Sequence, residues 1–496
     1  MLDMNEGFTY DAEIHSYQTE VTATAQWYYE QYSRPVFSHG YKNKQAIRIV
    51  VEHIANDIQC SKTRQLPLQK LLLDLFLRYK LTKGVGTIGV FTSCGKLTAK
   101  GSPQYKTFKV TGNIVRELVF ALKDQGYIEH KAGQPRHSTK LRATDKLIDL
   151  MEGSGITLND YSCRRIWPVC YTEIIKGEDE SALITKAKHR IDRAQAERLG
   201  LKKLILFNSL AIKSDIRVGT LPLLSYEKQL RRTFTDASGE FNGRMCGPIW
   251  QNLSSDARPF LTINGEGTTE YDICSTHPLI AYALNGHDLT SLIPYEGKPY
   301  ELHTIDTSIR VNRRIVKQAL LTMFNAADEN KAFQGLRSFV NTKVDSITGE
   351  LIYRTAWQRI CDEQGLSETE GYYWLFKQLE HKHHRISDFF YSEGWKRLNR
   401  LESEICLEVI AYFAEDHQTI VLPVHDSFIC PMSVSESLPE AIRAAISCAL
   451  KIEFQNPKLL VSEKAAPDHM NSQQAMDRLT QARTIRQDFK DRYRLT

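Results

Sequence analysis

The pattern of apolar and polar positions along the 496 residues separates regions that differ in predicted secondary structure. Within the first third, helical segments lead into a compact unit of helix, strand, turn and strand. The helix of this unit ends at Gly126, and the strand YIEH, a turn containing Pro135 and the strand TKLRAT follow. Apolar residues recur on one face of that helix, at Ile114, Leu118, Ala121 and Leu122.

This order of elements is the winged-helix arrangement, in which one helix enters the major groove and the hairpin touches the adjacent backbone. A cationic edge along the turn and second strand suits nucleic-acid phosphates. A winged helix used for protein contacts or for packing is the alternative, because basic wings are not confined to proteins that read DNA. The cationic residues are Lys131, Arg136, Lys140, Arg142 and Lys146.

The same pattern of apolar and polar residues divides the whole chain into four regions. Residues 1–160 are predicted to form a helical and winged-helix region that binds nucleic acid, and residues 161–232 are predicted to form a connector or support. Residues 233–467 carry the unusual motifs. Residues 468–496 are a polar tail of mixed charge, which we expect to be a surface helix or a frayed end, with weak nucleic-acid contact as a lesser alternative.

The segment TTEYDICSTHPLIAYALNG places an acid at the end of a predicted strand. TTEYDI is typical of a strand and HPLIAYAL of a helix, with Pro278 in its first turn, where the missing N–H costs little. Asp272 therefore stands at a strand end and faces the start of a helix. A lone Asp at such a place commonly caps or terminates the strand, so this segment alone predicts no chemistry.

A second acid interrupts LPVHDSFICP, which otherwise has a strand pattern. TIVLPV and SFICP predict a hairpin with His425 and Asp426 at its tip. Two strand-end carboxylates suit a metal-dependent phosphoryl-transfer site, because Mg²⁺ prefers one or two carboxylates plus water and phosphate oxygens. A pair of such ions clamps the attacking and the leaving oxygens. Asp272 and Asp426 are therefore the predicted metal ligands.

A predicted helix with a cationic face, SIRVNRRIVKQALLTMFNA, lies between these acids in the sequence. Its apolar residues, among them Ile315 and Leu320, can fill the opposite face. Positive charge on such a helix suits a triphosphate, because it offsets the charge on the leaving pyrophosphate. A solvated charged face is the common alternative, and the two flanking acids weaken it. The stripe consists of Arg310, Arg313, Arg314 and Lys317, at i, i+3, i+4 and i+7.

This ordered set resembles the palm and fingers of family A DNA polymerases and of their relatives, the single-subunit phage-type RNA polymerases. Asp272 with Ser275 and His277 resembles motif A, which reads DYSQIE in the DNA enzymes. Arg313 and Lys317 match the R-x3-K of motif B, and the HD of the hairpin matches motif C. The chain is also similar, along more of its length, to a bacterial and phage group with a winged-helix N-terminus.

A fourth segment, GRMCGPIWQN, resembles the family's TGR…PNLQN, whose Arg and Gln-Asn contact primer and template near the active site. By position these contacts fall on Arg244, Gln251 and Asn252, and His425 joins them. The resemblance covers roughly residues 242–431, under half of the chain. Its strength lies in four motifs in the correct order, since each motif alone is weak.

The resemblance implies an α+β fold with a polymerase right-hand palm (an antiparallel sheet with helices), short fingers, and a mainly helical N-terminal winged-helix domain. It implies two Mg²⁺ ions held by Asp272 and Asp426, with Mn²⁺ as a substitute. Arg313 and Lys317 would act catalytically, by binding the phosphates and stabilising charge as pyrophosphate leaves. The nucleotide site would also include Ser275, His277, Arg314 and Asn325.

Three departures from the family pattern leave the choice of sugar open. Ser427 follows the HD of motif C, as in the phage-type RNA polymerases, whereas the DNA enzymes have HDE. Asn325 and Ala326 replace the Tyr-Gly at the end of motif B, or Phe324 does if the helix is shifted by one. His277 replaces the Glu that crowds the sugar 2′ position, and it either excludes a ribose hydroxyl or hydrogen-bonds to it. Its bulk favours deoxynucleotides.

Two further features favour structural roles. A core helix predicted over residues 395–416 packs under the hairpin, and its Glu402 is interpreted as a salt-bridged surface residue rather than part of the site. The HKHHR of residues 381–385 lacks the i, i+4 spacing of a helical zinc motif, so a basic loop near nucleic acid or solvent is expected. No set of acids typical of a proofreading exonuclease precedes the palm.

Composition narrows the class of protein. The chain is 42% hydrophobic and 25% charged, which is ordinary globular usage, and its net charge of +5 permits a nucleic-acid partner without demanding one. Ten cysteines without a CxxC pair or zinc-ligand spacing indicate reduced thiols. No segment has the apolar length of a membrane span or a signal peptide. We therefore expect a cytoplasmic protein that contacts no membrane.

These features predict a template-directed nucleotidyltransferase, most simply a DNA polymerase without proofreading that replicates a phage, plasmid or other mobile element. Its partners would be DNA primer-template, nucleoside triphosphates and replication accessory proteins. An RNA polymerase or primase on the same scaffold is the nearest alternative, supported by Ser427. A non-catalytic DNA-binding replication initiator with a decayed palm is the second, and the retained acids and basic stripe argue against it.

Overall fold

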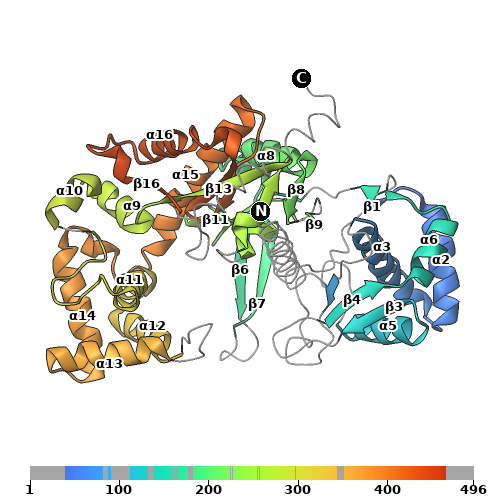
Figure 1. The fold of residues 1–496 in the computed structure, drawn as a ribbon, viewed down its shortest axis with the longest axis horizontal. Helices are drawn as coiled ribbons and strands as arrows, with labels where there is room; N and C mark the ends of the chain where they lie inside the picture. The colour runs from blue at the N-terminus through green and yellow to red at the C-terminus, as the bar shows by residue number, and fades with distance from the viewer. Residues whose placement is uncertain are drawn as a thin grey trace, which may run out of the picture.

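The computed structural model describes most of the chain between residues 40 and 464. The fold is α+β, and its buried apolar residues form two separate cores, one in each part of the chain. Figure 1 shows the N-terminal part at the right, helices α11 to α14 at the left, and the larger sheets between them. The residues that are not described are 1–39, 82–87, 91–111, 132–138, 159–160, 163–165, 177–182, 220, 224, 226, 254, 256, 297, 343–350 and 465–496.

The N-terminal part packs helices around a three-stranded antiparallel sheet with the order β2-β4-β3. A short pair of strands, β1 (Gly40–Tyr41) with β5 (Tyr161–Ser162), joins its two ends. The other elements are α2 (Lys44–Asp57), α3 (Gln65–Leu81), β2 (Ile88–Val90), α5 (Gly112–Asp124), β3 (Ile128–Lys131), β4 (Thr139–Ala143) and α6 (Asp145–Gly153).

The helix and the two strands of the predicted unit are confirmed as α5, β3 and β4. Leu118 and Leu122 of α5 are buried, and Gly126 ends the helix with a left-handed φ of 71°, which glycine adopts at little cost. The turn between the strands, with Arg136, lies outside the described residues. The use of this unit as a DNA-binding winged helix stays a prediction.

Part of the predicted cationic edge is already engaged within the protein. Arg142 pairs with Glu129 across the two strands, with its Nε 3.0 Å from the carboxylate. Lys146 donates to the Gln125 carbonyl at 2.8 Å and lies over the Tyr127 ring. Lys131, at the end of β3, is exposed and faces solvent.

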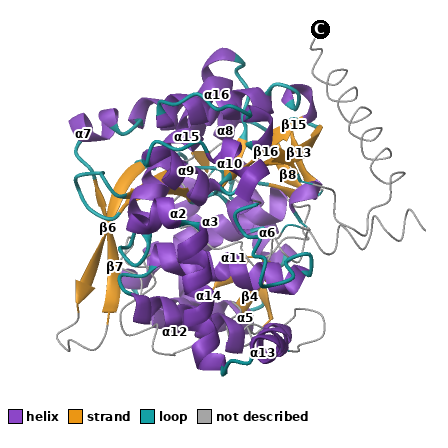
Figure 2. Cartoon of the chain, turned by 90° about the vertical axis from the view of Figure 1, so that its left-hand side faces the viewer, coloured by secondary structure: helices purple, strands orange, loops and turns teal. Residues whose placement is uncertain are grey.

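The second core extends from Val169 to Leu460 and therefore includes much of the region predicted as a connector. One of its sheets has the order β11-β10-β6-β7, with β10 parallel to β6 and the other pairs antiparallel. Its strands are β6 (Val169–Lys176), β7 (Leu183–Arg190), β10 (Arg231–Phe234) and β11 (Asn242–Cys246). The helices α7 (Arg193–Arg198) and α8 (Leu201–Lys213) lie between β7 and β10 in the sequence. Figure 2 shows β6 and β7 as a ribbon that extends from the body of the protein.

The central sheet is antiparallel and has the order β14-β15-β13-β12-β8-β9, with β16 also paired to β13. Its strands are β8 (Ile216–Val218), β9 (Leu221–Pro222), β12 (Leu261–Ile263), β13 (Glu266–Ile273), β14 (Leu422–Val424), β15 (Ser427–Pro431) and β16 (Val461–Glu463). The helices α9 (Thr276–Leu284), α10 (Leu289–Glu296), α15 (Trp395–Asp416) and α16 (Leu438–Leu450) lie near it.

Four of the helices between Asp272 and Asp426 in the sequence pack together as a bundle, and their buried residues belong to the second core. They are α11 (Arg310–Asn325), α12 (Glu329–Thr342), α13 (Ile352–Gln364) and α14 (Glu368–Lys382). Short 3-10 helices are η1 (Lys62–Arg64), η3 (Ile249–Asn252), η4 (Arg258–Phe260), η5 (His384–Phe389), η6 (Met432–Val434) and η7 (Pro457–Leu459).

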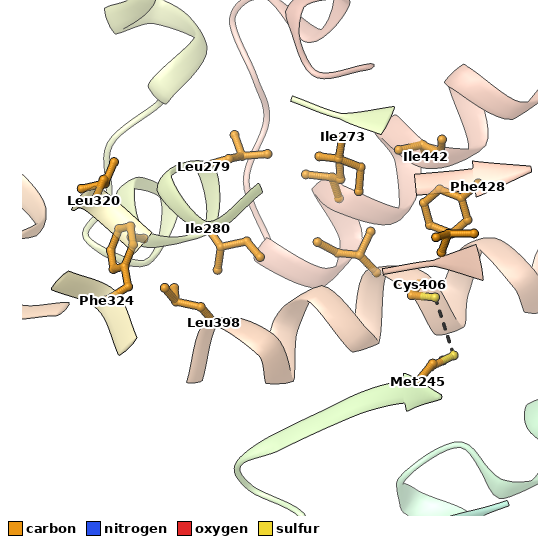
Figure 3. Packing of buried hydrophobic residues seen from close by; sticks show 14 of the residues in the cluster. Met245, Ile273, Leu279, Ile280, Leu320, Phe324, Leu398, Cys406, Phe428 and Ile442 are labelled. Carbon is orange, nitrogen blue, oxygen red and sulfur yellow. Dashed lines mark hydrogen bonds between the residues drawn. The ribbon is translucent and has the colours of Figure 1, made fainter. Parts of the chain in front are cut away.

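The long helix α15 confirms the predicted core helix and organises the packing beneath the two acids. Leu398 and Ile405 are fully buried, and Cys406 contacts Met245 of β11 at 3.6 Å. Figure 3 shows the side chains that surround α15: Ile273, Phe428 and Ile442 gather near one end, and Leu279, Ile280, Leu320 and Phe324 gather near the other.

A buried ion pair connects the two parts of the protein. Arg78 of α3 donates to Glu227 at 3.0 Å, and their side chains are only 1% and 5% exposed. The backbone carbonyl of Glu227 accepts from Ile249 at 2.9 Å. None of the helices among the described residues is both long and apolar enough to span a membrane, and the eight described cysteines are all free.

Candidate active site

Strand pairing brings Asp272 and Asp426 together at one end of the central sheet. β13 and β15 are antiparallel, with Asp272 opposite Ser427, the residue that follows Asp426. The Ile273 N–H donates to the Asp426 carbonyl at 3.0 Å, which ties the strand end to the hairpin tip. The predicted strand, helix and hairpin are all confirmed, and the two acids are neighbours in space.

The hairpin tip has a constrained backbone. Val424 pairs with Ser427, so His425 and Asp426 form a two-residue turn, and His425 has a left-handed φ of 59°. Such a φ is uncommon for a residue with a side chain. The Thr276 hydroxyl, at the start of α9, lies 3.1 Å from Asp426 Oδ2. These contacts fix the position of the Asp426 carboxylate.

The pKa of the Asp272 carboxyl is raised to about 6. Burial is the main cause, and repulsion by Asp426 adds to it. Lys464 and Lys317 oppose this rise in the pKa. A buried carboxylate with a raised pKa beside a second acid is typical of a site that accepts a cation.

Lys464 is a site residue that the sequence does not reveal. It follows the short strand β16, whose pairing with β13 brings it beside the acids. Its Nζ lies 2.6 Å from Glu270 Oε1 and 3.6 Å from Asp272 Oδ1. Nothing in the local sequence marks this lysine, because only the long-range pairing of β16 gives it a role.

Glu270 forms the centre of a charge cluster next to Asp272 on the same face of β13. Arg258 binds it through two nitrogens at 2.8 and 3.2 Å, and the Ser427 hydroxyl lies 2.5 Å away. Burial works to raise the pKa of Glu270, but the hydrogen bonds from Arg258, Lys464 and Ser427 hold it below its usual value. Ser427 is 1% exposed. It therefore faces Glu270 within the sheet rather than an incoming substrate.

The cationic helix α11 faces the acids through Tyr300. The guanidinium of Arg313 and the ammonium of Lys317 lie 5.3 and 5.4 Å from the centre of this ring. Burial raises the pKa of Tyr300 to about 12, with a hydrogen bond from Ser275 opposing it and both acids close enough to contribute. The sequence does not predict Tyr300 as a site residue, because this residue lies in a loop without a distinctive sequence motif.

The predicted amphipathic pattern of α11 is confirmed. Arg310, Arg313, Arg314 and Lys317 are exposed, whereas Ile315, Ala319, Leu320 and Met323 are buried. At the end of the helix, Asn325 is exposed and Phe324 is fully buried.

Phe324 rather than Asn325 contacts His277, which is the residue predicted to lie beside the nucleotide sugar. The rings of His277 and Phe324 meet edge to face, with centroids 6.3 Å apart. His277 Nε2 lies 3.0 Å from Asn399 Oδ1 and 3.1 Å from Glu402 Oε2, both on α15. Because both partners accept hydrogen bonds, Nε2 carries the proton. Nδ1 is buried and has no partner among the described residues.

The interpretation of Glu402 as a surface residue is wrong. It is 4% exposed, and it pairs with His277 and, at 3.4 Å, with Arg244. Burial works to raise its pKa, but the hydrogen bond from His277 and the charge of Arg244 hold the pKa below its usual value. The signal was present in the sequence, because position 402 shares the helical face of Leu398 and Ile405.

The segment predicted to contact primer and template packs against the hairpin. Gln251 Nε2 donates to the Pro423 carbonyl at 3.1 Å and Trp250 Nε1 does so at the same distance. Asn252 is exposed. Arg244 is 42% exposed, so its guanidinium is accessible at the edge of the site. Burial, followed by the charge of Arg244, lowers the pKa of His425.

The expectation of a basic loop at residues 381–385 is wrong for His383. This residue is 2% exposed, and its two nitrogens lie 3.0 Å from Tyr282 Oη and 2.9 Å from the Pro299 carbonyl. Burial lowers its pKa to about 4. The chain turns inward at the end of α14, which brings His383 into the core, whereas His381 and His384 stay exposed.

The donor set at the strand ends suits a hard divalent cation. The carboxylates of Asp272 and Asp426 supply oxygen ligands, and Mg²⁺ needs only one or two of these because it retains water and binds phosphate oxygens. Among the described residues there is no cluster of three or more His, Cys, Asp or Glu side chains that could hold a metal ion. Two carboxylates would leave most of the coordination positions of such an ion to water or to ligand oxygens.

No protein-family model matches this sequence, and no curated protein matches it significantly. The case for a function therefore rests on the geometry of the site.

Replacing Asp272 with Asn should stabilise the protein above pH 6. The pKa of Asp272 is about 6 in the folded protein against 3.8 for a free side chain. Between these values the folded state holds more protons than the unfolded state, so the free energy of unfolding falls as the pH rises. We expect Asp272→Asn to melt at a higher temperature than wild type above pH 6, and at a similar temperature near pH 4.

Thermal unfolding without divalent cations measures this effect. Asp416→Asn, at the exposed end of α15, is the matched control and should leave the melting temperature unchanged at each pH. An Asp272→Asn variant that is no more stable than wild type above pH 6 would contradict the raised pKa of Asp272, which has burial as its main cause and the charge of Asp426 as its second.

The buried contacts of Glu402 predict unequal effects of two substitutions. Glu402→Ala leaves His277 Nε2–H and Arg244 without this acceptor and should lower the free energy of unfolding by about 2 kcal/mol. Glu402→Gln keeps an acceptor for His277 and should cost about half as much. Urea unfolding measures both, and a change below about 0.5 kcal/mol for Glu402→Ala would indicate a surface role.

Proposed function

We propose that this protein is a template-directed nucleotidyltransferase, and that it acts as a DNA polymerase without a proofreading exonuclease. The observation that carries the proposal is the convergence of Asp272 and Asp426 at paired strand ends that face the cationic residues Arg313 and Lys317. Each part came from a separate segment of the sequence, and the fold brings the parts to one place.

The incoming triphosphate would lie between α11 and the strand ends. Arg313 and Lys317 supply positive charge that would bind the phosphates and offset the charge that develops on the leaving pyrophosphate. Asp272 and Asp426 would hold two Mg²⁺ ions, or Mn²⁺, whose charge would activate a primer 3′-hydroxyl and neutralise the triphosphate. Tyr300, whose hydroxyl interacts with Ser275, would line this site between α11 and the acids.

The surroundings of His277 favour deoxynucleotides. Its side chain is 14% exposed, Nε2 is bound to Glu402 and Asn399, and Nδ1 is buried. Neither nitrogen is therefore positioned to bind a sugar hydroxyl. Of the two roles considered for His277, exclusion of a ribose hydroxyl by bulk is the better supported.

The remaining residues would handle the nucleic acid. Arg244, at the exposed edge of the site, is suited to the primer-template near its 3′ end, and the cationic strand edge of the N-terminal part is suited to a second contact with duplex phosphates. Ser427 is the feature that favours an RNA polymerase or primase, and its burial against Glu270 weakens that argument. A non-catalytic replication initiator has no need for the repelling pair of acids.

Loss of one acid should abolish nucleotide incorporation without loss of DNA binding. Asp426→Asn removes a carboxylate from the pair, and we expect primer extension to fall about a thousandfold, which corresponds to several kcal/mol of transition-state stabilisation. Primer extension with Mg²⁺ and deoxynucleotides measures the rate, and fluorescence anisotropy of a labelled primer-template measures binding.

Asp416→Asn again provides the matched control and should extend primers at the wild-type rate. Wild-type protein that incorporates no nucleotide on any primed or unprimed template would overturn the proposal. An Asp426→Asn variant that retains full activity would exclude the two-acid site.

Removal of the His277 ring should relax the choice of sugar. In His277→Ala the space beside the sugar is open, and we expect the ratio of kcat/KM for deoxynucleotides to that for ribonucleotides to fall about tenfold. Single-nucleotide incorporation on a primed template measures this ratio, and the exposed His384→Ala is the control. A wild-type preference for ribonucleotides would instead support the RNA polymerase alternative.

A further inference from the structure

A cavity of 460 Å³ lies in the helical bundle, among residues that have no part in the site described above. Helix α12 contributes Arg337 and Asn341, α13 contributes Arg354, and α14 contributes Glu368 and Tyr372. Most of the lining side chains are polar hydrogen-bond donors or acceptors. Three helices that converge on such a set can form a binding site.

Tyr372 lines this cavity and carries an unsatisfied hydroxyl. The residue is 2% exposed, and its hydroxyl has no hydrogen-bond partner among the described residues. A buried hydroxyl without a partner costs free energy, so its retention calls for an explanation. Burial raises the pKa of Tyr372 to about 12, so at neutral pH the hydroxyl keeps its proton and can donate it to a ligand.

The Tyr372 ring is held in place by its neighbours. It stacks on Trp357 with centroids 4.6 Å apart and an interplanar angle of 15°, and Phe333 meets it edge to face at 5.4 Å. The preceding residue, Gly371, leaves no room for a Cβ, which would lie 2.5 Å from Cys361 Sγ. The hydroxyl is therefore held in place by the packing of three helices.

Two arginines accompany this hydroxyl without carboxylate partners. Arg337 and Arg354 are exposed, and neither forms an ion pair with any residue that the structure describes. Both lie close enough to the Tyr372 hydroxyl to act on its pKa. Glu368 is the one carboxylate in the lining, and its Oε1 accepts from Gln358 at 2.9 Å. The balance of charge at the cavity is thus +1 when Arg337, Arg354 and Glu368 are counted.

We propose that this cavity is a second phosphate-binding site, in which Arg337 and Arg354 bind phosphate oxygens and the Tyr372 hydroxyl donates to another. Two guanidinium groups and a neutral hydroxyl donor match the oxygens of a phosphoryl group. The phosphate comes either from a nucleic-acid strand or from a free polyphosphate. A strand is favoured because Tyr373, 38% exposed beside Tyr372, stacks in parallel on Phe333 at 5.2 Å and offers an aromatic face to a base.

The test compares full-length variants in a background that removes competing triphosphate binding at the first site. In Arg313→Gln/Lys317→Gln protein, calorimetry measures the Kd of inorganic tripolyphosphate, and anisotropy measures the Kd of a labelled single-stranded oligodeoxythymidine. Adding Arg337→Gln/Arg354→Gln should raise at least one of these Kd values about tenfold. Arg198→Gln, an exposed arginine on α7, is the matched control and should change neither.

A loss confined to the oligonucleotide identifies a strand as the ligand, and a loss confined to tripolyphosphate identifies a free polyphosphate. Unchanged Kd values for both probes would overturn the proposal, as would equal losses in the Arg198→Gln control.

Tyr372→Phe separates binding from folding, because it removes only the hydroxyl. Without ligand its melting temperature should equal or exceed that of wild type, since an unsatisfied group is lost. Its Kd for the probe that the arginines bind should rise several-fold. A variant that is less stable than wild type without ligand, with its Kd unchanged, would show that the hydroxyl serves the fold and would overturn its assignment to the site.

Discussion

The pairing of β13 with β15 is the constraint on which the rest of the site depends. It places two carboxylates side by side, and the surrounding residues reduce the cost of doing so. Lys464 lies beside Asp272, Arg258 neutralises Glu270 on the same strand, and Lys317 acts from α11. These positive charges offset much of the repulsion between the acids in the folded protein. Asp272 nevertheless keeps a raised pKa and an affinity for positive charge.

Helix α15 carries polar groups through an otherwise apolar core. Its buried residues include Leu398 and Ile405, yet Asn399 and Glu402 project toward His277, and Ser403 accepts from Arg232 at 2.7 Å. Each buried polar group has a partner, so the helix supports both the packing and the orientation of the site. The same helix contacts β11 through Cys406 and Met245, which links the two sheets.

Sequence patterns predicted the elements whose residues are ordered locally. β13, α9, the hairpin of β14 and β15, α11 and α15 all follow from periodicity and turn residues, and the two acids follow from their places within these elements. What local pattern could not supply is the partner of each residue. Tyr300 and Lys464 gain their roles from contacts between segments distant in sequence, and His383 is buried because the chain turns inward after α14. Glu402 is different, since the periodicity of α15 places it on the buried face with Leu398 and Ile405, and this outweighs the general preference of glutamate for exposed positions.

The buried pair Arg78–Glu227 ties the N-terminal part of the protein to the second core. Separation of the parts would leave a desolvated charge on each side, which is strongly unfavourable. From Glu227 the backbone bonds to Ile249, and the neighbouring Gln251 bonds to Pro423 in the hairpin that carries Asp426. The spacing between the cationic strand edge and the acids is therefore set by direct contacts rather than by the length of a linker. Under the proposed function, a duplex bound at both the cationic strand edge and the acids would span a fixed distance. The fold would then set the number of base pairs between the strand edge and the reacting end.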